Sequence, residues 1–198
     1  MGTDLIDRAG LAQDFDEAID GLEAGLRSCP AELWQTSMWT VPRTDPWVWP
    51  KPGTDPVPER TDEAIQIFSS VANIAYHCLW FLDFYVSVEP GFQSPDYMRG
   101  GPEEMAWPAD GAAPIHDWVF PSDVLLRYLA HGRDNARQRL ASVSEAELAA
   151  PCPPGHPHAG KTLSELLQVN LRHVREHGVQ IHDFLVGHGV DLTRPAGQ

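Results

Sequence analysis

Three histidines lie close together in the segment "LRHVREHGVQIHDF", residues 171–184. His173 and His177 are four residues apart, so in a helix they lie one above the other on the same face. Two imidazoles in that arrangement can share one metal ion, as in the helical H-x-x-x-H pair of zinc proteases. The protease motif needs a glutamate directly after the first histidine, and that position is Val174 here. The spacing is therefore compatible with a metal pair and argues against a metalloprotease.

The direction in which this pair points follows from its neighbours on the helix. On a wheel of about 100° per residue, His173 and His177 share an arc with apolar residues and Asn170, while His182 falls on the charged side. The pair should therefore face inward. Buried imidazoles need partners for a donor and an acceptor each. Two interpretations stay open, a metal site and a pair of hydrogen-bonded core histidines.

A metal site needs a third ligand, and His77 is the best candidate. It lies in the most apolar stretch of the chain, "VANIAYHCLWFLDFYV", residues 71–86. At helical spacing it shares a polar-to-aromatic strip with Asn73 and Trp80, which either lines a cavity or forms an exposed face. We expect a cavity, with Asn73, Trp80 and Asn170 as pocket residues and His116 reaching it from a loop as a substrate contact.

The other chemically capable residues give weaker signals. His156 and His158 form an H-x-H pair in a proline-rich loop and are expected in solvent. Cys78 follows His77 but should point about 100° away from it, which favours a small core residue. The sequence has neither a serine nucleophile elbow nor a glycine-rich phosphate loop.

These residues are carried by four stretches with apolar residues at three-four spacing. Thr162 and Glu165 form a T-x-x-E capping box before the last of them, and strand signals are weak. The sequence therefore predicts an all-α, four-helix bundle in a single domain, residues 1–198. The expected helices span about residues 4–27, 61–88, 122–143 and 163–186.

Two connections are longer than such a bundle requires, residues 30–60 and 89–121. Both are rich in proline and tryptophan. Long loops are often lids or binding loops. The alternative is that the tryptophans fill the open ends of the bundle, and the sequence does not decide between these roles.

The composition and charge of the chain limit the kinds of partner that it is expected to bind. The formal net charge is −14, which disfavours nucleic acid and anionic membranes. Three cysteines, none in a C-x-x-C pair, argue against a disulfide framework and a thiolate zinc site. The acidic N-terminus has no apolar signal-peptide core. We therefore expect a cytoplasmic protein that acts on a small-molecule substrate.

The chain resembles the DinB/YfiT-like family of four-helix-bundle metalloproteins. The resemblance rests on "SSVANIAYHCLWFLDFYV" and "NLRHVREHGVQIHDFL", which look like the family's second and fourth helices. It implies an up-down-down-up bundle in which His77, His173 and His177 bind a metal. Family members with assigned chemistry are often transferases or isomerases using thiols such as bacillithiol or mycothiol, others are metal-dependent hydrolases, and homodimers are common.

Four functions remain in competition. The first is a transferase in which a divalent zinc, nickel or iron ion activates a low-molecular-weight thiol. The second is a hydrolase in which the same ion activates water, with His116 or Asp117 as a base. The third is a bundle that binds a metal or small ligand without catalysis, and the fourth is a metal-free bundle with core histidines. The nearly all-apolar second helix leaves a homodimer open.

Overall fold

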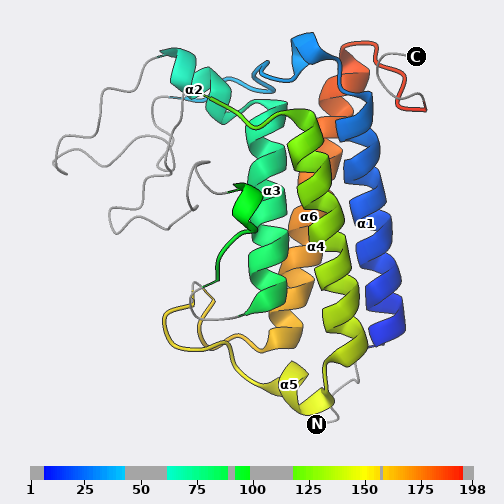
Figure 1. Cartoon of the computed structure of the whole chain (residues 1–198), viewed down its shortest axis with the longest axis vertical. Helices are drawn as coiled ribbons and strands as arrows, with labels where there is room; N and C mark the ends of the chain where they lie inside the picture. The colour runs from blue at the N-terminus through cyan, green and yellow to red at the C-terminus, as the bar shows by residue number, and fades with distance from the viewer. Residues whose placement is uncertain (1–6, 43–61, 89–91, 99–117, 157, 194–198) are drawn as a thin grey trace, which may run out of the picture.

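The computed structural model describes residues 7–42, 62–88, 92–98, 118–156 and 158–193. Four long helices dominate (Figure 1): α1 (Arg8–Ser28), α3 (Val71–Ser87), α4 (Ser122–Ser142) and α6 (Leu163–Gly187). Two shorter helices, α2 (Asp62–Phe68) and α5 (Glu145–Ala149), and two 3-10 turns, η1 (Ala31–Leu33) and η2 (Asp96–Met98), join them. The described residues contain no β-strand, so the all-α prediction is confirmed.

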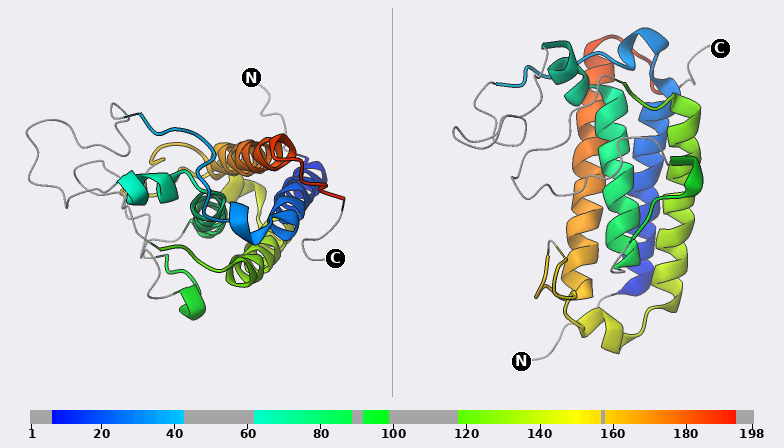
Figure 2. Two further views of the ribbon diagram at one scale, coloured as in Figure 1. Left: turned by 90° about the horizontal axis from the view of Figure 1, so that it is seen from above. Right: turned by 60° about the vertical axis from the view of Figure 1, so that its left-hand side comes forward.

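The long helices form a bundle with a closed ring of contacts. Helix α1 packs against α4 and α6, and α3 packs against the same two helices from the opposite corner (Figure 2). Helices α1 and α6 run upward in Figure 1, whereas α3 and α4 run downward. This is the expected up-down-down-up order. It places α3 directly beside α6, the two helices that carry the candidate ligands.

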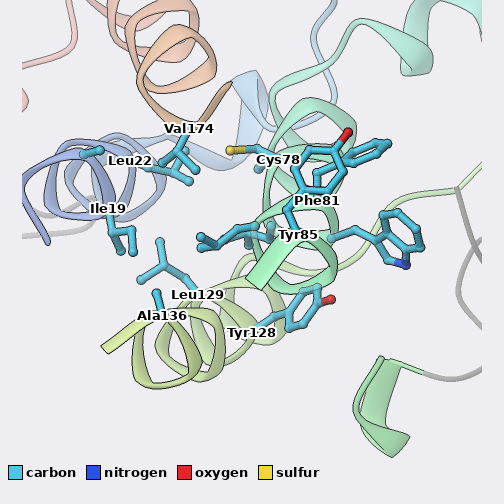
Figure 3. Close-up of a cluster of buried hydrophobic side chains, with 14 of the residues drawn as sticks. Ile19, Leu22, Cys78, Phe81, Tyr85, Tyr128, Leu129, Ala136 and Val174 are labelled. Atoms are coloured by element: carbon cyan, nitrogen blue, oxygen red, sulfur yellow. The ribbon is translucent and has the colours of Figure 1, made fainter. Parts of the chain in front are cut away.

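The core lies on the axis of the bundle, where all four helices contribute side chains (Figure 3). Ile19 and Leu22 of α1, Leu129 of α4 and Val174 of α6 are at most 1% exposed. Burying each such side chain stabilises the fold by about 1.5–3 kcal/mol. Cys78 is also fully buried in this core, as predicted. The core therefore holds α3 and α6 together without any help from the histidines.

Helix ends explain why two of the predicted helices begin where they do. The Thr162 hydroxyl accepts a hydrogen bond from the Glu165 backbone N–H, and the Glu165 carboxylate accepts one from the Thr162 N–H. The predicted capping box is thus confirmed at the start of α6. Helix α1 begins at Arg8, capped by the Asp7 carboxylate, and not near residue 4. Residues 4–6 lie outside the described part of the chain.

The single helix predicted over residues 61–88 is wrong, because the chain breaks between α2 and α3. The Ser70 hydroxyl caps α3 by accepting from the Asn73 N–H, and the Asn73 amide donates to the Phe68 carbonyl at 2.8 Å. The Ser69 carbonyl accepts from the Met38 N–H instead of continuing a helix. Serine and asparagine side chains compete with helical hydrogen bonds in this way. Helix α5 was not predicted at all.

Residues 34 and 118–120 of the two long connections meet at one end of the bundle. Trp34 is buried, and its indole N–H donates to the Phe120 carbonyl at 2.9 Å. Trp118 packs against the Phe120 ring, with ring centroids 5.2 Å apart. These two tryptophans therefore help to close an end of the bundle. Trp47, Trp49 and Trp107 lie outside the described residues, and none of the described helices is long and apolar enough to cross a membrane.

Candidate metal centre

The three histidines singled out in the sequence meet between α3 and α6. His77 Nε2 lies 3.0 Å from His173 Nε2, and His177 Nε2 lies 3.0 Å from the same atom. Three potential ligand atoms thus lie within 4.8 Å of one another. Two nitrogens 3.0 Å apart, each about 2.1 Å from one ion, subtend about 90° at that ion. The three nitrogens therefore converge as ligands on one side of a coordination sphere would.

Burial keeps these imidazoles neutral, which is the state that binds a metal. Desolvation lowers the pKa of His77 well below its ordinary value, and neighbouring His177 and His173 lower it further. Burial also lowers the pKa of His173, to about 3, with a smaller contribution from His177. The pKa of His177 is lowered by burial, although its contact with Gln180 acts in the opposite direction.

Hydrogen bonding settles which nitrogen of His177 is available. Its Nδ1 lies 2.7 Å from the Gln180 Oε1 atom. An amide oxygen only accepts, so Nδ1 carries the proton and Nε2 presents a lone pair. Such a partner on the far side of the ring orients a metal-binding histidine and fixes its tautomer. Gln180 follows the H-x-x-x-H pair in the segment that resembles the family's fourth helix, but the sequence assigned it no role. Its place three residues after His177 was the available signal.

The neutral triad is poorly satisfied by hydrogen bonds alone. With the His177 Nε2 atom an acceptor, the single Nε2–H of His173 would have to serve two neighbours at once. If that proton sits on Nδ1 instead, it meets no acceptor among the described residues, because the buried His173 Nδ1 has no partner there. One cation in contact with all three Nε2 atoms removes the conflict at these atoms, and the Nδ1–H of His173 is then the one donor of the triad without an acceptor among the described residues. The donor set thus fits a divalent metal, for which neutral imidazole is a common ligand.

The surroundings of the triad are aromatic rather than acidic. The Phe81 ring lies 4.9 Å from the His77 ring and 5.4 Å from the His173 ring, between centroids. Among the described residues, no carboxylate or thiol joins the three-histidine group. Cys78, next to His77, is fully buried, and burial raises the pKa of its thiol. Among the described residues, only the three neutral imidazoles would hold an ion, which would therefore supply its full positive charge at this point.

A comparison with models of known protein families matched the DinB superfamily over residues 14–181. The chain belongs to the DinB superfamily. No curated protein and no solved structure gave a match. The matched region contains α3 and α4, most of α1 and α6, and all three histidines. Family membership and the histidine geometry are each compatible with a metal-binding protein.

The predicted pocket residues of this DinB protein are dispersed along its helices. Asn73 closes the α2–α3 break, and Trp80 is buried against Phe84 and Phe92, with ring centroids 4.9 and 5.5 Å away. Asn170 is fully buried, and its amide donates to a backbone carbonyl of α3 at 3.0 Å. The described contacts thus give each of the three a structural role, and their pocket role stays a prediction. His116 lies outside the described residues.

Two other polar groups emerge only in the structure. Contrary to the expectation of a solvated H-x-H pair, His156 is 9% exposed and stacks on Phe84, with ring centroids 5.0 Å apart. His158 contacts the Tyr85 hydroxyl at 3.1 Å. A buried carboxylate, Asp83 of α3, lies against polar residues of α4. In the sequence, the available signal for Asp83 was a single acidic residue within an otherwise apolar helical segment.

Proposed function

We propose that this DinB protein is a metal-dependent transferase that joins a low-molecular-weight thiol to an electrophilic small molecule. The observation that carries the proposal is the convergence of three neutral Nε2 atoms, which no carboxylate or thiolate of the described residues joins. A divalent ion held by His77, His173 and His177 would supply Lewis acidity, which lowers the pKa of a coordinated thiol or water.

The protein offers no thiol of its own at this point. Cys29, Cys78 and Cys152 are all free and all buried. Burial raises the pKa of Cys29, to about 12, and also raises that of Cys78, so neither thiol ionises readily at neutral pH. A nucleophilic sulfur at the triad would therefore have to come from a second molecule. This favours a thiol cosubstrate over a cysteine of the chain as the nucleophile.

Each residue of the site has a defined task under this proposal. The three histidines hold their lone pairs toward one point, and Gln180 fixes the tautomer of His177 through the 2.7 Å contact. Phe81 shields His77 and His173 from water on one side. In the transfer, the sulfur forms a bond to the electrophilic carbon, the thiol proton passes to solvent, and the leaving group departs with the bonding electrons.

The test uses the full chain incubated with zinc or nickel and then desalted. A chromogenic electrophile, chlorodinitrobenzene, is offered with cysteine, glutathione, mycothiol or bacillithiol in turn. We expect thiol-dependent turnover that a chelator stops and that His173→Ala lacks. Arg172→Ala is the matched control, since Arg172 is an exposed neighbour on the same helix.

Two other outcomes would replace the proposal by one of its alternatives. Chelator-sensitive hydrolysis of nitrophenyl acetate, without thiol-dependent transfer, would identify a hydrolase. A bound metal with neither activity would identify a bundle that binds metal without catalysis.

A further inference from the structure

A pocket of about 510 Å³ lies between α3 and α4. Asp83, Phe92, His131 and Asn135 are among its lining residues, and none of the three metal-site histidines is. The triad lies instead where α3 meets α6. The pocket is therefore a second candidate site, independent of the proposed metal chemistry.

The floor of this pocket is a buried carboxylate. The Asp83 side chain is only 2% exposed. Its Oδ1 accepts from the Asn135 amide at 2.7 Å, and its Oδ2 accepts from the Tyr128 hydroxyl at 3.2 Å. Both donors are neutral. Burial raises the pKa of Asp83, while the hydrogen bond from Asn135 opposes that rise.

His131 lies closer to the Asn135 amide than to the Asp83 carboxylate. Its Nε2 lies 3.4 Å from Asp83 Oδ2, beyond a good hydrogen bond, and 2.9 Å from the Asn135 Nδ2 atom. Because that amide nitrogen donates, His131 Nε2 accepts from it with its single lone pair. The hydrogen bonds from Asn135 and Tyr128 leave a second lone pair on Asp83 Oδ2 that neither of these donors occupies.

The arginine that lines the pocket, Arg139, forms an ion pair with a residue other than Asp83. Arg139 lines the pocket, but its Nη1 pairs with Glu147 of α5 at 3.1 Å. Among the described residues, no lysine or arginine forms an ion pair with Asp83. Buried charges are normally paired, since an isolated one is costly to remove from water. Within the described part of the chain, the α3–α4 pocket thus holds a buried carboxylate without a lysine or arginine partner.

From this geometry we infer that the α3–α4 pocket binds a small organic cation, a protonated amine with an N–H group that reaches Asp83 Oδ2. An ammonium has several donors and no acceptor, so it can satisfy the remaining lone pair of Asp83 Oδ2 and supply a positive charge beside the carboxylate. Val86 and Phe92 give the pocket apolar wall, suited to the carbon part of an amine, and an aromatic face favours a nearby cation. The volume admits a molecule of about amino-acid to nucleoside size.

The test compares three probes of one shape and different charge. Benzylamine (a cation at pH 7.5), benzyl alcohol (neutral) and benzoate (an anion) are titrated into the full chain and followed by protein-observed NMR. We expect benzylamine to bind at least tenfold more tightly than either other probe. The shifted amide signals should fall near residues 83–87 and 131–142, on both walls of the pocket.

Variants separate this site from the metal centre. Asp83→Asn keeps the shape and removes the charge, so benzylamine binding should weaken at least tenfold. Gln138→Trp places a ring at the exposed edge of the pocket and should abolish binding even if Asp83→Asn fails to fold. His77→Ala should bind benzylamine as the parent does, whatever happens to its metal.

Three results would overturn the inference. Equal binding of benzyl alcohol would show that charge plays no part. Tighter binding of benzoate would show that Arg139, not Asp83, is the anchor. Benzylamine binding that survives Gln138→Trp, or signals that shift only around the three histidines, would place the amine outside the pocket.

Discussion

Gln180 provides a sensitive test of the metal centre, because it touches no ion and acts only through His177. Its amide oxygen accepts the Nδ1–H of His177 at 2.7 Å and leaves Nε2 free to coordinate. Gln180→Ala removes this acceptor at an exposed position, so the fold should be unaffected. Loss of such an outer partner typically weakens metal binding by about 10–100-fold, or about 1.4–2.7 kcal/mol.

The assay is a competition titration of zinc between the protein and a chromogenic chelator. Gln168→Ala is the matched control, since Gln168 is an exposed glutamine on the same helix and has no contact with the triad. Gln180→Glu should bind zinc at least as tightly as the parent, because a carboxylate accepts the same hydrogen more strongly. Equal zinc affinity in Gln180→Ala and the parent would refute the assignment of His177 Nε2 as a ligand oriented by Gln180.

Three further predictions concern protonation and packing. Burial lowers the pKa of all three histidines, to about 3 for His173, so zinc binding at pH 6 should release few protons. Calorimetry in buffers of different ionisation enthalpy measures the number of protons released. A release of about two or more protons per zinc ion would contradict this prediction. The same lowered pKa values mean that the unfolded chain binds more protons than the folded protein between about pH 6.5 and pH 3. The free energy of unfolding of the metal-free protein, measured by urea titration, should therefore decrease as the pH falls through this range. The decrease should be smaller for His173→Ala. Gly132→Ala should destabilise the folded protein by about 1–2 kcal/mol, because the new Cβ would lie 3.0 Å from Leu82 Cδ2. Gly21→Ala has no atom within 4 Å of the new Cβ and should stabilise the fold by up to about 1 kcal/mol. Equal urea midpoints for the two variants would refute the packing argument.

The bundle and the three-histidine cluster were accessible from sequence because both depend on helical periodicity. Apolar residues at three-four spacing defined the inner faces, and His173 and His177 fell on one such face. The T-x-x-E box marked the start of α6 to the residue. His77 was identified because it lies within a helix that is otherwise apolar, and the structure brings it within 3.0 Å of His173.

What the sequence did not reveal depends on contacts between distant segments. At the break between α2 and α3, the Ser69 carbonyl accepts from the Met38 N–H, and the Ala72 N–H donates to the Trp34 carbonyl. Both partners lie more than 30 residues earlier in the sequence. A continuous apolar pattern cannot disclose such partners. The burial of Asp83 against α4 likewise depends on the relative rotation of two helices.

The burial of His156 likewise depends on where its loop folds back, which is against Phe84 of α3. Local patterns specified each helix, whereas the polar contacts between helices and loops needed the three-dimensional arrangement.

The central claim is that His77, His173 and His177 form one metal site. Its most direct test is the metal content of the full chain by elemental analysis, after incubation with zinc or nickel and desalting, for the parent and each histidine-to-alanine variant. The claim predicts about one ion per chain in the parent and far less in each variant, with helical circular dichroism unchanged. A parent that retains no ion, or a His77→Ala variant that retains a full equivalent, would contradict it.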